Sequence, residues 1–134
     1  MLDIMTKVTK QKMIFRKDLR ANRDTLYLFG DNLERVGLAG QAGQMRGEIN
    51  AVGIPTKKKP TMEEDAFFTD ADLFEFAQMI DDNFVEVFAH VHHGGSVVVP
   101  EDGLGTGLSQ LPQRAPACYQ YLERKLEFLE KIGA

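Results

Sequence analysis

Residues 25–32 read Thr-Leu-Tyr-Leu-Phe-Gly-Asp-Asn, an apolar run that stops at turn-forming residues. A continuous apolar run bounded by turn residues is typical of a strand that is covered on both faces, and such strands belong to parallel sheets. The sequence therefore predicts a central strand over residues 25–29, followed by a turn at Gly30-Asp31-Asn32.

Three further short apolar runs predict the other strands of this sheet. They cover residues 13–15, 50–54 and 96–99, and the last two end at Pro55-Thr56 and at Pro100-Glu101-Asp102. Proline and acidic or hydroxyl side chains at the end of an apolar run favour a turn. We therefore expect about four strands.

Segments with helical periodicity alternate with these strands. Residues 39–46 predict a short helix, and a long amphipathic helix begins with Thr69 as N-cap and ends at Gly94-Gly95. A last helix begins near Pro112, where proline suits the first turn. The alternation predicts a three-layer α/β domain with a small, mostly parallel or mixed sheet flanked by helices.

Composition limits the classes of protein to which the chain can belong. The 134 residues are 43% apolar and 27% charged, which predicts one globular domain over residues 1–134. A net charge of −4 argues against affinity that comes mainly from duplex phosphates. The single Cys118 allows neither an internal disulfide nor a cysteine zinc site, and no stretch has 18 consecutive apolar residues. We expect a cytoplasmic protein that does not enter membranes.

The turns that follow three of the strands carry the residues of greatest chemical interest. They are 30–32, 55–57 and 101–107. In α/β folds ligands bind at the carboxyl ends of the strands, so we expect these turns to converge on one crevice.

Gly103-Leu104-Gly105-Thr106-Gly107-Leu108 lies between a predicted strand and a predicted helix. Glycines let backbone N–H groups approach an anion, and a helix N-terminus adds positive partial charge, so the segment is typical of a phosphate cradle. The alternative is a tight turn with no ligand. No Gly-Lys-Ser or Gly-Lys-Thr follows, so this is not the phosphate loop of classical NTPases.

A second loop of small residues covers 36–43 and leads into the short helix. Small side chains let a ligand lie against the main chain. Close packing of the helix on the sheet is an equally good explanation of this loop taken alone. Two such loops in one domain favour a diphosphate held between them.

Lys57 is predicted to be the first of three lysines after a strand, and the nearest of them to the crevice. Partial desolvation there lowers the pKa of an amine and makes it a nucleophile. Lys58 and Lys59 are interpreted as solvated surface residues.

Carboxylates and histidines give weaker signals. Asp31, Glu101 and Asp102 can orient a ribose hydroxyl or an adenine amine, or act as a base, but each is equally well explained as a turn residue. His90, His92 and His93 lie in the last turn of the long helix without a plausible set of partner ligands, so no metal site is predicted.

Two motifs resemble the macrodomain superfamily of ADP-ribose-binding α/β modules. They are Gly-Ile-Pro-Thr-Lys-Lys-Lys-Pro at 53–60 and Gly-Leu-Gly-Thr-Gly-Leu-Ser-Gln-Leu at 103–111. The resemblance is to the branch that includes terminal ADP-ribose glycohydrolases and antitoxin macrodomains that remove ADP-ribose from DNA. In that branch a Thr-Lys pair follows a strand, and a Gly-x-Gly-Leu-Asp-x-Leu loop precedes the last helix. Gly40-Gln41-Ala42 is similar to that family's first small-residue loop.

The resemblance implies a set of site residues and a reaction. Loop 103–108 would hold the diphosphate and the distal ribose, and loop 37–42 would lie opposite. Lys57 would attack the anomeric carbon, while the family's catalytic Asp falls on Ser109. Either Asp102 or Glu101 therefore replaces it, or the domain binds without cleaving. The implied ligand residues are Asp31, Asn32, Gly40, Gln41, Ala42, Thr56, Gly103, Gly105, Thr106, Gly107, Leu108 and Ser109, with Lys57 and Asp102 as catalytic residues.

The functional expectation is therefore binding of ADP-ribose or a related nucleotide, with hydrolysis of an ADP-ribosyl bond as a further hypothesis. The implied partner is ADP-ribose or an ADP-ribosylated macromolecule, nucleic acid included, and no cofactor is expected. One alternative is a non-catalytic binding module, which Ser109 favours. Another is a Rossmann-like nucleoside-monophosphate N-glycosidase, whose glycine loop is distantly similar to residues 100–108.

Overall fold

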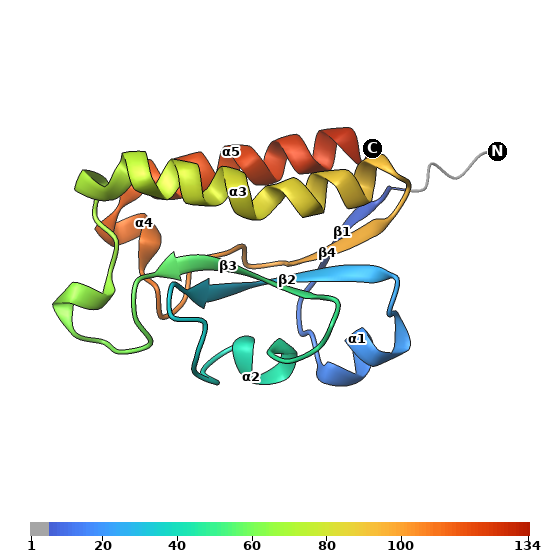
Figure 1. Ribbon diagram of the computed structural model, residues 1–134, viewed down its shortest axis with the longest axis horizontal. Coiled ribbons are helices and arrows are strands. Elements are labelled where there is room, and N and C mark those ends of the chain that lie inside the picture. The colour runs from blue at the N-terminus through green and yellow to red at the C-terminus, as the bar shows by residue number, and fades with distance from the viewer. Residues whose placement is uncertain (1–5) are drawn as a thin grey trace.

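The computed structural model describes residues 6–134, which form a four-stranded parallel sheet (Figure 1). The strands are β1 (Val8–Gln11), β2 (Thr25–Asn32), β3 (Ala51–Lys57) and β4 (Ser96–Pro100), in the spatial order β1-β4-β2-β3. All three pairings are parallel. The predicted fold class is confirmed, and the run at 25–29 lies in an interior strand.

Helices cover both faces of the sheet (Figure 1). The long helices α3 (Leu73–His92) and α5 (Pro116–Ile132) lie together on one face. The shorter α1 (Arg16–Ala21) and α2 (Ala42–Met45) lie on the other. None of the helices in residues 6–134 has the length and apolar character required to cross a membrane.

Strand β2 contributes to a core on each side of the sheet because successive side chains of a strand point to opposite faces. Leu28 is fully buried in the cluster under α3 and α5. Tyr27 and Phe29 lie in the second cluster, with Leu19 of α1 and Met45 of α2. Burial on both faces explains why residues 26–29 are apolar throughout.

The strand predicted at 13–15 is wrong. The first strand is β1, whose Val8 and Thr9 pair with β4. Ile14 is buried as a single apolar side chain of the second cluster. Phe15 precedes α1, where its N–H donates to the carboxylate of Asp18 at 2.8 Å. The apolar run at 13–15 therefore connects β1 to a helix that was not predicted.

The end of the chain also differs from the prediction. Instead of one helix from Pro112, a four-residue helix α4 (Leu111–Arg114) precedes α5. Pro116 causes the break, because proline disfavours helical geometry in the residue before it, and Ala115 has φ −145° and ψ 68°. The long helix is preceded by short 3₁₀ turns at Glu64–Ala66 and Asp70–Asp72, and it ends before Gly94 as predicted.

Strands β2 and β3 extend further than their apolar runs. Gly30-Asp31-Asn32 belongs to β2, and Pro55, Thr56 and Lys57 belong to β3. Proline is tolerated in β3 because this strand lies at the edge of the sheet. Asn32 pairs with Lys57 across a register shift, so the chemically interesting ends of these two strands lie side by side.

Candidate functional site

The three predicted turns converge at the carboxyl ends of the strands, where two adjoining pockets open. The pocket that contains Lys57, here the lysine pocket, has a volume of about 300 Å³. The second, here the glycine-loop pocket, has a volume of about 270 Å³. Of the predicted site residues, the lysine pocket is lined by Asp31, Asn32, Ala42, Lys57, Leu108 and Ser109. The glycine-loop pocket is lined by Gly40, Gln41, Thr56, Asp102, Gly103, Gly105, Thr106, Gly107, Leu108 and Ser109.

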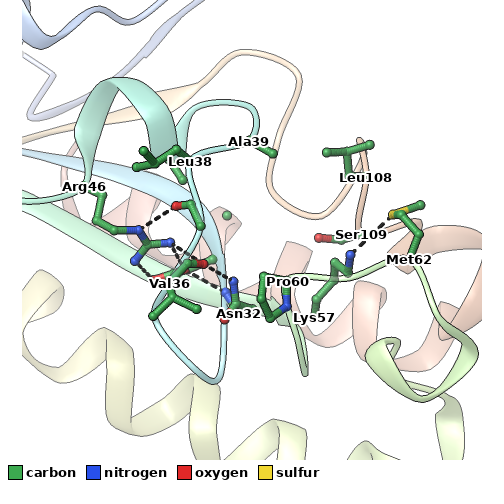
Figure 2. Close-up of a pocket in the computed structure, with 14 residues that line it drawn as sticks. Asn32, Val36, Leu38, Ala39, Arg46, Lys57, Pro60, Met62, Leu108 and Ser109 are labelled. Atoms are coloured by element: carbon green, nitrogen blue, oxygen red, sulfur yellow. Dashed lines mark hydrogen bonds and ion pairs between the residues drawn. The ribbon is translucent and has the colours of Figure 1, made fainter.

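The two pockets form one groove with two lobes. Gly30, Ala39, Leu108 and Ser109 line both of them. Figure 2 shows Ala39 and Leu108 on opposite sides of the opening. Gly30 lets β2 lie close to the side chain of Thr56, because a Cβ at this position would lie 3.3 Å from Oγ1 of Thr56.

Loop 103–109 lines the glycine-loop pocket and has backbone donors that are not used within the part of the protein that the structure describes. Gly103 and Gly105 have φ values of 87° and 81°, which L side chains rarely adopt. A Cβ on Gly105 would also come within 3.0 Å of the Leu111 side chain. None of the N–H groups of residues 104–109 donates to another group in the described chain 6–134. The loop therefore leaves a row of amide donors available for an anion.

A helix dipole adds little to this loop, contrary to expectation. Helix α4 has four residues, and Gln110 before it is left-handed with φ 48°. A helix of one turn sums too few aligned peptide dipoles to approach the half charge of a long helix. The cation at this pocket is instead Lys12, which lines it from the end of β1.

Lys57 lies in a desolvated position, as predicted, although it is the last residue of β3 and does not follow it. Its side chain is 7% exposed, and Figure 2 shows it pointing toward Ser109 and Met62. Nζ donates to the carbonyl of Thr61 and lies 3.5 Å from the sulfur of Met62. Burial lowers the pKa of the Lys57 amine, and the positive charge of Arg114 lowers it further.

Ser109 lies where the two pockets meet. Its hydroxyl is 2.5 Å from Oγ1 of Thr56, and Thr56 is fully buried. Asp102 lines the glycine-loop pocket and not the lysine pocket, so the two predicted catalytic residues face different lobes. Glu101 lines neither pocket. A hydroxyl pair therefore occupies the position where the resemblance would place a carboxylate.

The carboxylate of Asp31 is engaged within the protein. Its side chain is 1% exposed and accepts from Arg46 at 2.6 Å and Arg35 at 3.4 Å. The amide of Asn32 is also used internally, because it donates to the carbonyl of Val36 at 2.8 Å. Besides Lys57, the lysine pocket is lined by a second cation, Arg46. Arg46 was not predicted as a site residue.

Arg46 also holds the first small-residue loop in place. Its guanidinium donates to the carbonyls of Gly37 at 2.8 Å and Val36 at 3.2 Å. A Cβ on Gly43 would lie 2.5 Å from the carbonyl oxygen of Leu38, so this loop and α2 are in close contact. The loop therefore packs closely against α2 and also lines the groove.

Sequence reasoning missed Lys12, Arg46, Pro60 and Met62, all of which line the groove. Lys12 directly follows β1, whereas the first strand was predicted at residues 13–15. Arg46 reaches the site through its pairing with Asp31, 15 positions earlier in the chain. Pro60 and Met62 follow Lys57 closely, and no sequence pattern assigned them to the site.

The histidines and the cysteine lie away from the groove. His90, His92 and His93 are at the C-terminal end of α3, and Nδ1 of His93 is 2.7 Å from the carbonyl of Ala89. Cys118 is fully buried, and this burial raises the pKa of its thiol to about 11. In the described part of the chain, no three His, Cys, Asp or Glu side chains gather closely enough to hold a metal ion.

The fold and the groove define a three-layer α/β domain with a two-lobed pocket at the carboxyl ends of its strands. The chain belongs to a family of unknown function, DUF7831, whose sequence profile matches residues 9–125. No curated protein and no solved structure matches the chain.

Proposed function

We propose that this protein binds ADP-ribose or a related nucleotide in the two-lobed groove. The observation that carries the proposal is the row of unpaired amide donors at 104–109 beside a lobe that contains a desolvated lysine. Backbone amides in such a loop are a common means of binding phosphate. The macrodomain-like motifs at 53–60 and 103–111 agree with this assignment.

The shape of the groove suits a ligand with two parts. Each lobe is near the lower end of the range of about 300–1,000 Å³ that is usual for small-molecule sites. In the proposed pose the diphosphate lies against loop 104–109, with Lys12 as a counter-charge. The distal ribose then extends past Ser109 toward Lys57.

The proposal includes hydrolysis of an ADP-ribosyl bond. A neutral Lys57 amine would form a bond to the anomeric carbon while the leaving group departs with the electron pair of the broken bond. The proton lost from the amine would reach the leaving group through water. Water would then cleave the lysine–ribose bond and restore the amine. Desolvation of Lys57 supports this role, because it favours the uncharged nucleophilic form.

A non-catalytic binding module is the second candidate. It is favoured by the pairing of Ser109 with Thr56, which places no carboxylate there to act as a base. The engagement of Asp31 by Arg46 removes the other acidic group of the lysine pocket. Under either candidate the proposed partner is ADP-ribose or an ADP-ribosylated macromolecule, nucleic acid included, in the cytoplasm.

Titration calorimetry with ADP-ribose, AMP and ribose 5-phosphate tests the binding proposal. We expect ADP-ribose to bind more tightly than either fragment, because only it occupies both lobes. Equal affinity for AMP, or no heat at millimolar ADP-ribose, would contradict the proposal.

Incubation with an ADP-ribosylated oligonucleotide and an ADP-ribosylated peptide separates the two candidates. Release of ADP-ribose by the parent protein and not by Lys57→Ala supports hydrolysis. Tight binding without release over hours supports the binding module.

A further inference from the structure

Arg114 of α4 and Lys57 of β3 approach the same aromatic ring. The Arg114 guanidinium carbon lies 3.7 Å from the centroid of Phe67, and Nζ of Lys57 lies 4.9 Å from it. A cation over an aromatic face is attracted by the quadrupole of the ring. Two cations that share one ring in a largely buried place also repel each other.

The Arg114 side chain is held firmly in this position. Its Nε donates to the side chain of Gln110 at 2.8 Å, and one terminal nitrogen donates to Glu64 at 2.9 Å. The Glu64 side chain is 86% exposed, whereas that of Arg114 is 28% exposed. Water therefore screens the carboxylate more than the guanidinium, and the positive charge beside Phe67 is only partly compensated.

Charged groups on the segments around Lys57 act mainly on one another. Lys58 pairs with Asp72, Lys59 with Asp65 and Arg46 with Asp31. Glu34 and Glu63 act on Lys59. No carboxylate in residues 6–134 forms an ion pair with Nζ of Lys57. Arg114 is thus the charged side chain placed to act on this amine.

We propose that Arg114 is a positioning residue which, across the ring of Phe67, disfavours the charged form of the Lys57 amine and helps to direct it into the lysine pocket. Repulsion by Arg114 disfavours the ammonium form, and the ring fixes the approach of both side chains. The biological meaning of this inference rests on the proposed function, in which Lys57 needs a free electron pair. The pair of residues itself can be tested without any ligand.

Competitive acetylation with trace acetic anhydride measures this effect. The reaction consumes only the neutral amine, so the pH midpoint of labelling, followed by peptide mass spectrometry, reports the pKa of each lysine. Access to the pocket changes the plateau rate and not the midpoint. In the parent protein we expect the midpoint of Lys57 to lie below the usual pKa of a lysine amine.

Two variants should move this midpoint in opposite directions. Arg114→Gln removes the repelling charge and should raise the midpoint, so that less Lys57 is labelled at pH 8 than in the parent. Glu64→Gln leaves Arg114 uncompensated and should lower it. Arg114→Lys keeps the charge and should stay near the parent.

Arg124→Gln is the matched control, because Arg124 is exposed on α5. It should leave the midpoint of Lys57 unchanged. The same midpoint in the parent, Arg114→Gln and Glu64→Gln overturns the inference, even if ADP-ribose binds. A failure of ADP-ribose to bind leaves this measurement unaffected, so the two proposals can fail separately.

Discussion

Substitution of Gly107 by Asp gives the sharpest functional prediction, because the structure predicts little steric cost. Gly107 is exposed, its φ lies outside the left-handed region, and a Cβ built there meets nothing within 4 Å. The variant should therefore fold with nearly the stability of the parent. It would place a carboxylate on the loop proposed to hold the diphosphate.

The expected loss of affinity follows from Coulomb's law. A carboxylate about 5 Å from each of two phosphate charges costs about 0.8 kcal/mol per charge at the dielectric constant of water. The total of about 1.7 kcal/mol corresponds to a loss of roughly 15- to 20-fold in ADP-ribose affinity. Screening should reduce this loss as salt is raised, since the Debye length falls from about 10 Å at 0.1 M to about 3 Å at 1 M.

Titration calorimetry at two salt concentrations is the assay, and Gly107→Asn is the uncharged control of nearly equal shape. Gly107→Asn should bind ADP-ribose close to the parent level. If Gly107→Asp and Gly107→Asn have the same affinity at low salt, loop 104–109 does not hold the diphosphate.

Three further predictions concern stability and reactivity. Arg46→Gln leaves the buried Asp31 carboxylate with one cation, Arg35 at 3.4 Å, and the N–H of Asn32 at 2.8 Å, and should cost about 3–5 kcal/mol in urea unfolding. A loss below about 1 kcal/mol would refute the role given to Arg46. Leu122→Ala in the fully buried core should cost about 2–5 kcal/mol, whereas Phe128→Ala at a side chain 53% exposed should cost less in the same assay. Cys118 should resist iodoacetamide at pH 8 until the protein unfolds, because burial raises its pKa from 9.0 to about 11. For the same reason stability should fall as pH rises from 9 toward 11, since the unfolded thiol ionises first.

The parallel α/β class of the fold was predictable because β2 and β4 are mostly apolar on both faces. Residues 26–29 and 97–99 are apolar throughout, and helical segments separate them. Convergence of the glycine loop, the Thr56-Lys57 pair and the end of β2 then followed, because the carboxyl ends of parallel strands meet at one edge. Lys57 was recognised for the same reason.

Other features depend on contacts that no local pattern reveals. β1 is a four-residue edge strand, Val-Thr-Lys-Gln, whose polar residues conceal it, and Lys12 was missed with it. The pairing of Arg46 with Asp31 joins residues 15 positions apart, and Arg114 with Phe67 joins elements still more distant in the chain. The break at Pro116 had a signal, because proline rarely lies inside a helix.

The central claim is that the backbone amides of residues 104–109 hold the diphosphate. The most direct test is an NMR titration of ¹⁵N-labelled protein with ADP-ribose, followed amide by amide. The account predicts the largest and saturable shifts at residues 104–109, with smaller ones at 36–43 and near Lys57. Saturable shifts confined to another surface, with the amides of 104–109 unmoved, would contradict it.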